Sequence, residues 1–169
     1  VRVDDLVPAG APSPGPGIRV IGDLHPGDGL GRSRAASALS QCDMVIVQHE
    51  FGIYGGADGD EVIDVLERIL STRVVVLHTV PADATPHQRA VLRRVTDVAD
   101  VVVVMTHAAQ DIIADQYAVP TSRLALIPHG VDPRPWPVEH LRLASRPVML
   151  TWGLIGPGKG IEWGIRALA

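Results

Sequence analysis

Histidines recur at a regular interval in this sequence. His49, His78 and His107 are 29 residues apart, and each stands at the end of a short apolar run, as does His129 further along. The charge of an imidazole changes near neutral pH, so one of them could act as a general acid or base or stabilise a transition state. Zinc binding is a second interpretation. A simple hydrogen bond at the start of a loop is a third, which we favour for His107 and His129.

Short runs rich in valine and isoleucine precede these histidines. They span residues 44–48, 74–77, 101–105 and 124–127, with further runs at 18–22 and 148–151. Uninterrupted apolarity is typical of strands that are covered on both faces in a parallel sheet. We therefore expect parallel strands, with the runs at 44–48, 74–77 and 101–105 near the centre of the sheet.

Segments with helical spacing lie between the apolar runs. One apolar helical face is formed by Val62, Val65, Leu66, Ile69 and Leu70. Thr85 followed by Pro86 predicts the start of another helix, and Thr106 predicts the cap of a helix that runs to about Tyr117. This alternation predicts an α/β fold: a Rossmann-like parallel sheet with flanking helices.

Ligands of open α/β sheets bind beyond the carboxyl ends of the strands. At that edge stands the sequence QHEFGIYGG, residues 48–56, in which His49 and Glu50 leave an apolar strand. Gly55 and Gly56 would let the backbone turn tightly or approach a ligand. A helix-capping loop is the alternative interpretation. We expect Glu50, His78 and Gly130 to lie on one edge of the sheet.

A glycine-rich stretch at residues 151–162 is the second candidate site. Lys159, the single lysine beside fourteen arginines, stands there between Gly158 and Gly160. Backbone N–H groups at the start of a helix favour phosphate, and a lysine adds a full positive charge. The spacing is not that of a Walker loop. The stretch predicts a phosphate contact, with a solvated loop lysine as the alternative.

The bulk composition narrows the class of protein. Hydrophobic residues make up 46% and charged residues 20%, which is typical of a globular chain, and the net charge of −4 lacks the basic excess of a nucleic-acid-binding protein. One cysteine, Cys42, excludes an internal disulfide framework. No apolar run approaches the ~20 residues of a membrane span. We expect a cytoplasmic protein and, because the sequence starts at Val1 and stops within a helical pattern, a piece of a longer chain.

These motifs together resemble family-4 retaining glycosyltransferases of the two-domain GT-B fold, and more narrowly bacterial group-1 enzymes with a QHEFGIFGG-like stretch. Tyr54 replaces the usual phenylalanine. The resemblance continues through Leu77-His78-Thr79, residues 127–131 and residues 153–162, and it covers about Arg32 to Ala169. It implies an acceptor-side N-terminal domain at residues 1–145, incomplete at its start, and the beginning of the nucleotide-sugar domain at residues 146–169.

The resemblance also implies roles for individual residues. His78 matches the family histidine near the transferred sugar, and Lys159 matches the lysine that contacts the donor diphosphate. Leu154 stands where the family usually has an arginine. The family's first strand with its glycine-rich loop and its later pair of glutamates do not occur in these 169 residues. We therefore expect the chain by itself to be inactive.

The reaction that the resemblance implies is transfer of a sugar from a nucleotide diphosphate sugar to an acceptor hydroxyl with retention. It needs no metal and no cofactor. The acceptor would be a carbohydrate, a lipid-linked molecule or another small molecule. The residues that we expect to help bind the acceptor or the sugar are His49, Glu50, Gly55 and Gly56. A lipid-linked acceptor would bring the protein to the inner face of the membrane. A nucleotide-sugar epimerase of the same shape and a non-catalytic module that binds a glycan or a protein are the alternatives.

Overall fold

The computed structural model describes residues 2–3, 20–131, 149–151 and 159–168, the first two by their backbone alone. The chain divides into two compact units, Val1–Gly130 and Val131–Ala169. The domain boundary that we expect near residue 145 lies outside the described residues.

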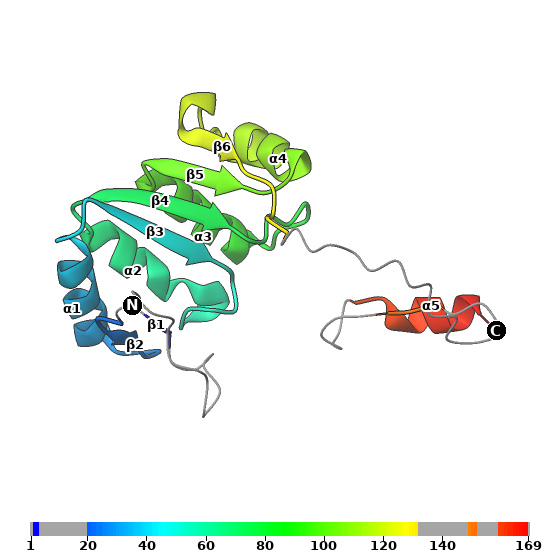
Figure 1. Cartoon of the computed structure of the whole chain (residues 1–169), viewed down its shortest axis with the longest axis horizontal. Coiled ribbons are helices and arrows are strands. Elements are labelled where there is room, and N and C mark those ends of the chain that lie inside the picture. Colours follow the sequence, from blue (N-terminus) through cyan, green and yellow to red (C-terminus); the bar gives the residue numbers. More distant parts are fainter. Residues whose placement is uncertain (1, 4–19, 132–148, 152–158, 169) are drawn as a thin grey trace. The chain divides into compact units, whose positions relative to one another are not determined.

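A four-stranded parallel sheet forms the centre of the first unit (Figure 1). Its strands are β3 (Met44–His49), β4 (Thr72–Leu77), β5 (Val101–Val104) and β6 (Leu124–Leu126), which are neighbours in chain order. Val75 is paired with Val47 on one side and with Val102 on the other. The parallel arrangement confirms the expected α/β fold, a parallel sheet with flanking helices, and is consistent with a Rossmann-like domain.

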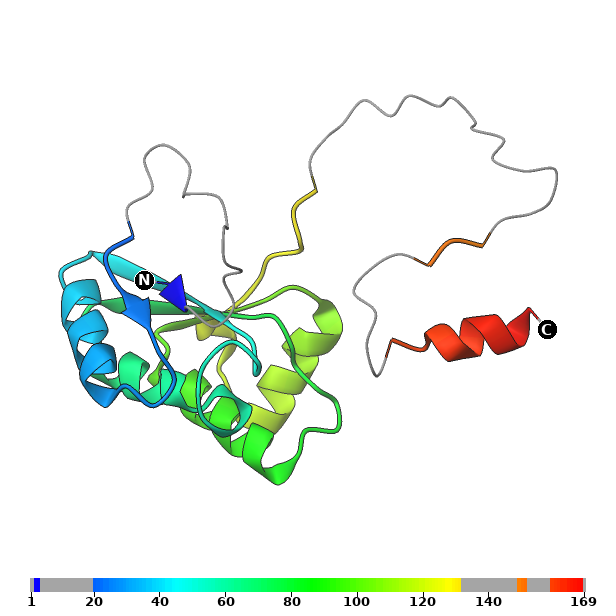
Figure 2. The same cartoon turned by 90° about the horizontal axis from the view of Figure 1, so that it is seen from below.

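Helices follow the strands on one side of the sheet. They are α1 (Gly29–Leu39), α2 (Glu61–Arg68), α3 (Pro86–Val98) and α4 (His107–Tyr117), with short 3-10 turns at η2 (Ala57–Gly59) and η3 (Thr121–Arg123). Figure 2 shows α1 to α4 together on one side of the strands. When successive parallel strands are joined by crossovers of one hand, the connecting helices lie on the same face.

Strand β3 shows the consequence of this one-sided cover. Val45, Val47 and His49 are buried, whereas Met44 and Ile46 are 54% and 60% exposed. The strand also lies at one end of the four-stranded sheet, next to β4 alone. In the part of the chain that the structure describes, the expectation of a central strand covered on both faces is therefore wrong for residues 44–48.

Helices α3 and α4 start where the sequence predicts, whereas α2 ends earlier than predicted. Thr85 accepts a hydrogen bond from Gln88 N and Pro86 is the first residue of α3, while Thr106 accepts one from Ala109 N at the start of α4. Helix α2, however, ends at Arg68 because Ile69 adopts an extended backbone. Leu70 is 89% exposed, so its assignment to the apolar face of α2 is wrong.

Helix α1 and the segment before it were not predicted. Residues 20–22 form no strand, and the short strand β2 (Asp23–Leu24) instead pairs in parallel with β1 (Arg2–Val3). Asp28 caps α1 by accepting a hydrogen bond from Gly31 N at 2.8 Å. Only the small residues Ala35 and Ala36 of α1 are buried, so the helix lacks the strong apolar stripe by which sequence patterns reveal helices.

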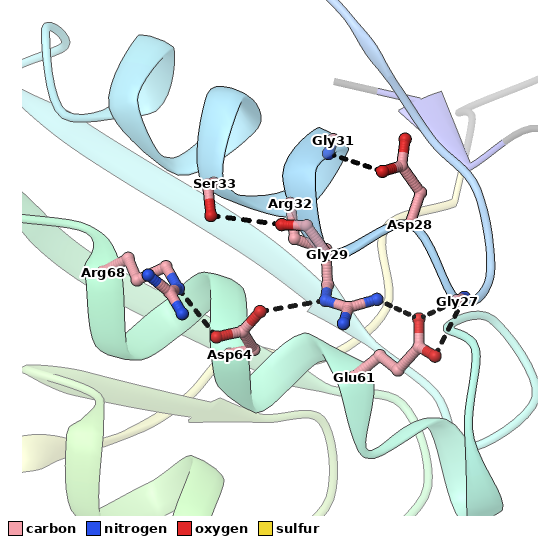
Figure 3. A network of polar contacts seen from close by, with 9 residues as sticks. All are labelled: Gly27, Asp28, Gly29, Gly31, Arg32, Ser33, Glu61, Asp64 and Arg68. Carbon is pink, nitrogen blue, oxygen red and sulfur yellow. Dashed lines mark hydrogen bonds and ion pairs between the residues drawn. The ribbon is translucent and has the colours of Figure 1, made fainter.

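A cluster of charged side chains joins α1 to α2 (Figure 3). Arg32 donates from Nη1 to Glu61 Oε2 at 2.6 Å and from Nε to Asp64 Oδ2 at 3.0 Å. Asp64 also accepts from Arg68, and the carboxylate of Glu61 accepts from the backbone N of Gly27. We call Arg32, Glu61, Asp64 and Arg68 the ionic cluster. It ties the loop before α1 to the start of α2.

The second unit contains one helix, α5 (Ile161–Ala167), among its described residues. Gly160 precedes it with φ +67°, a left-handed conformation that favours glycine. Residues 149–151 form no strand, which corrects the expected strand at 148–151 over these three positions. Leu154 and most of the glycine-rich stretch lie outside the described residues. Across the described parts of the chain, none of the helices has the length and apolarity needed to cross a membrane.

Candidate functional site

The ends of β3 and β4 hold each other through three contacts. His78 N donates to the carbonyl of His49 at 3.0 Å, and His78 Nε2 lies 2.6 Å from Gln48 Oε1. The Thr79 hydroxyl donates to Glu50 Oε2. Three consecutive residues after the apolar part of β3 thus fix two consecutive residues that follow β4. We call Gln48, Glu50, His78, Thr79 and the nearby His129 the rim.

The pleat of β3 explains why Gln48 and His49 lie on opposite faces of the sheet. Successive side chains of a strand point to opposite faces. Gln48 is exposed on the open face, whereas His49 points into the helix-covered face and is fully buried. Glu50 follows the strand, and its Oε1 accepts from the backbone N of Phe51 at 2.9 Å. Both carboxylate oxygens of Glu50 are therefore engaged in bonds that shape the rim.

A hollow of about 340 Å³ opens beside His78. Its polar lining consists of His78, Thr79, Thr106 and His129, and apolar side chains from the end of β4, from the loops after β4 and β5 and from α4 complete it. The rings of His78 and His129 lie 6.2 Å apart between centroids. None of the described residues that line this hollow is acidic or basic apart from the histidines. The contacts confirm that Glu50, His78 and the His129-Gly130 segment share one edge of the sheet.

His49 is an unusual buried group. Neither of its ring nitrogens has a hydrogen-bond partner among the described residues, and its ring meets Phe51 edge-on at 5.3 Å. Burial lowers the pKa of His49 to about 4, because the charged imidazolium would lose its hydration. The ring is therefore neutral at pH 7. Its predicted contact with acceptor or sugar stays a prediction, and in this structure its side chain has no exposed surface.

The loop after Glu50 is packed against its surroundings. The Tyr54 hydroxyl donates to the carbonyl of Gln48 at 3.0 Å, and burial raises the pKa of Tyr54 to about 12, so it stays a neutral donor. A Cβ at Gly55 would come within 2.8 Å of Pro26, and Gly56 has φ +82°. The close contact with Pro26 explains the glycine at position 55, and the left-handed backbone explains the glycine at position 56. Both explanations agree with the helix-capping interpretation. A ligand contact by Gly55 or Gly56 stays a prediction.

The predicted donor contacts belong to the second unit. Lys159 is exposed, and Gly160 is the residue that precedes α5. Gly158 lies outside the described residues. The phosphate contact of these three residues stays a prediction.

Sequence reasoning overlooked two members of the rim. Gln48 and Thr79 were noticed only as parts of motifs, although a polar residue near the end of an apolar strand is itself a signal. His107, by contrast, is exposed at the first turn of α4 and is not part of the hollow's lining. Among the described residues, no group of three or more histidine, cysteine or acidic side chains is arranged to hold a metal ion.

The fold and the rim define a Rossmann-like α/β domain with a hollow at the carboxyl ends of its strands. No protein-family model matches the chain, and no curated protein or solved structure is significantly similar to it. Any closer assignment therefore depends on the motifs and on the geometry of the rim.

Proposed function

We propose that this chain is part of a retaining glycosyltransferase that moves a sugar from a nucleotide diphosphate sugar to an acceptor hydroxyl. The observation that carries the proposal is the place of His78. It follows β4, is held by Gln48 and lines the hollow of about 340 Å³. The motif resemblance assigns this histidine to the neighbourhood of the transferred sugar.

The chemistry of the hollow suits such a substrate. Imidazoles and hydroxyls can donate or accept hydrogen bonds, as the hydroxyls of a sugar require. Aliphatic side chains form the rest of the lining, and its volume falls within the range of roughly 300–1,000 Å³ that is usual for small-molecule sites. No carboxylate is among the described residues that line the hollow.

The same lining favours one mechanism of retention. A double displacement needs a carboxylate that is free to attack the anomeric carbon as nucleophile. Glu50 is the acidic member of the rim, and its two oxygens already accept hydrogen bonds from Phe51 N and from the Thr79 hydroxyl. We therefore propose front-face transfer, in which the leaving diphosphate helps to deprotonate the acceptor while Lys159 opposes its developing charge.

The test uses the intact protein and a panel of nucleotide diphosphate sugars. Release of the nucleoside diphosphate is measured with and without carbohydrate and lipid-linked acceptors. We expect one donor to give release, and His78→Ala to reduce turnover by ~100-fold or more, as loss of a transition-state stabiliser does. His107→Ala is the matched control, because this histidine is exposed on the same edge but outside the hollow. Release from no donor, or equal losses in both variants, would refute the proposal.

The donor half of the proposal is tested in the same assay. Lys159→Ala should reduce turnover by ~100-fold at saturating donor, and Lys159→Arg should restore only part of it, because a planar fork does not replace a compact ammonium. Arg166→Ala is the control, since Arg166 is an exposed cation on α5. Wild-type turnover and donor affinity in Lys159→Ala would show that the diphosphate contact is wrong.

A further inference from the structure

Gln48 and His78 are both exposed, and their side chains contact each other at the rim. Gln48 Oε1 lies 2.6 Å from His78 Nε2, between neighbouring parallel strands. The backbone of His78 is fixed at the same place, because its N donates to the carbonyl of His49. The ring is therefore held at two points, one on the main chain and one on Nε2.

The end of the Gln48 amide that faces the ring sets the protonation of the ring, and in this structure that end is the oxygen Oε1. An amide oxygen only accepts hydrogen bonds, so the ring nitrogen that faces it must carry a proton. A neutral imidazole has one such proton, and with Nε2 protonated its Nδ1 keeps a free lone pair. Among the residues that the structure describes, no group is bonded to His78 Nδ1.

We propose that Gln48 is the positioning residue of His78. It fixes the neutral tautomer with the proton on Nε2 and leaves Nδ1 as a hydrogen-bond acceptor for a substrate hydroxyl in the hollow. The identity of that hydroxyl depends on the proposed glycosyl transfer, whereas the tautomer does not.

An amide suits this role better than a carboxylate would. A carboxylate beside Nε2 would favour the doubly protonated imidazolium, whose Nδ1 donates and no longer accepts. Gln48 supplies the same acceptor geometry without a negative charge. The difference between the two groups makes the proposal testable at one position.

The tautomer is measured directly by NMR of the intact protein with 15N-labelled histidine, with the His78 signals assigned by their loss in His78→Ala. The shifts of the two ring nitrogens differ strongly between protonated and unprotonated nitrogen. At slightly alkaline pH we expect Nε2 protonated and Nδ1 unprotonated. In Gln48→Leu the two shifts should move toward each other, as both tautomers become populated. In Gln48→Glu both nitrogens should be protonated at a pH where the wild-type ring is neutral.

Gln41→Leu is the matched control, because Gln41 is an exposed glutamine just before β3, at the opposite end of the strand. It should leave the His78 signals unchanged. A wild-type ring protonated on Nδ1, or identical His78 signals in the wild type and in Gln48→Leu, would overturn the proposal.

Turnover separates this inference from the proposed function. In a transferring protein, Gln48→Leu and Gln48→Glu should each lower kcat by about tenfold, which is less than the roughly 100-fold or more that a general acid or base contributes directly. The NMR measurement needs no substrate. A protein that shows the expected tautomers but transfers no sugar supports the role of Gln48 and counts against glycosyl transfer.

Discussion

The ionic cluster and the rim satisfy their polar groups in opposite ways. In the ionic cluster every charged side chain meets an opposite charge, and Arg32 alone contacts both Glu61 and Asp64. Among the described residues, the two ring nitrogens of His78 have one partner at the rim, and those of the neighbouring His49 have none. The cluster uses its hydrogen-bonding capacity within the protein, whereas the rim keeps part of it unused.

The two regions also differ in the volume of the adjoining pocket and in the charge state of their side chains. The pocket beside the ionic cluster holds about 10 Å³, against about 340 Å³ beside the rim. Hydrogen bonds from Arg32 and Arg68 lower the pKa of Asp64, so this carboxylate stays charged well into acid. Burial lowers the pKa of His49 to about 4 and keeps that ring uncharged at neutral pH. The contacts of the cluster therefore lie within the protein, and ligand binding at the rim stays a proposal.

The largest expected effect concerns His49 and acid. Its pKa is about 4 in the folded protein and 6.5 without burial, so the unfolded chain binds the extra proton first. Its neutral form is fully compatible with folding above pH 6.5, and stability should fall by about 3 kcal/mol as pH falls from 6.5 toward 4. His49→Leu should remove this loss. Denaturant unfolding at several pH values measures it.

His107→Leu provides the comparison for His49, because His107 is exposed. Its pH dependence of stability should match that of the wild type. Asp64 of the ionic cluster should not contribute over this range, since its pKa is lowered and the stability it provides is lost only as pH falls below the usual carboxyl range. An unchanged pH slope in His49→Leu would contradict the buried neutral imidazole.

Arg32→Met tests the other side of the comparison. It leaves Glu61 and Asp64 without their shared partner, and the Arg32 side chain is 17% exposed. We expect a loss of about 2 kcal/mol in the free energy of unfolding, with turnover unchanged where the protein is folded. Arg94→Met is the control, because the Arg94–Glu67 pair is exposed and worth at most about 1 kcal/mol. Equal losses in the two variants would show that the cluster is an ordinary surface network.

Glu50→Gln should have the smallest effect of these variants. Unlike Arg32→Met, it should lower turnover and leave the free energy of unfolding nearly unchanged. The amide keeps one oxygen for the Thr79 hydroxyl or for Phe51 N but loses the charge that strengthens both bonds. We expect turnover to fall about tenfold, or roughly 1.4 kcal/mol, with little change in thermal stability. Glu67→Gln on the surface of α2 should leave turnover unchanged and lower stability by at most about 1 kcal/mol, because it removes only the exposed pair with Arg94. Wild-type kinetics in Glu50→Gln would leave the segment with a purely structural role.

Local patterns predicted the elements that depend on local interactions. Apolar runs located β5 and β6 to within one residue and most of β3 and β4. Thr85 with Pro86 and Thr106 located two helix starts, because a strand face or a cap is encoded within a few residues. Helix α1 escaped prediction since small residues bury little surface. The ionic cluster escaped because Arg32 and Glu61 are far apart in the chain, with no local trace of their contact.

The candidate site was predicted in position but not in detail. The sequence by itself determined the alternating α/β order and the edge at which polar residues collect, because both follow from strand and helix periodicity. Only the tertiary structure decided that β3 lies at the end of the described sheet, that His49 points inward and that Gln48 holds His78. Those outcomes depend on strand order and on the register between β3 and β4, which arise from contacts between residues distant in the chain.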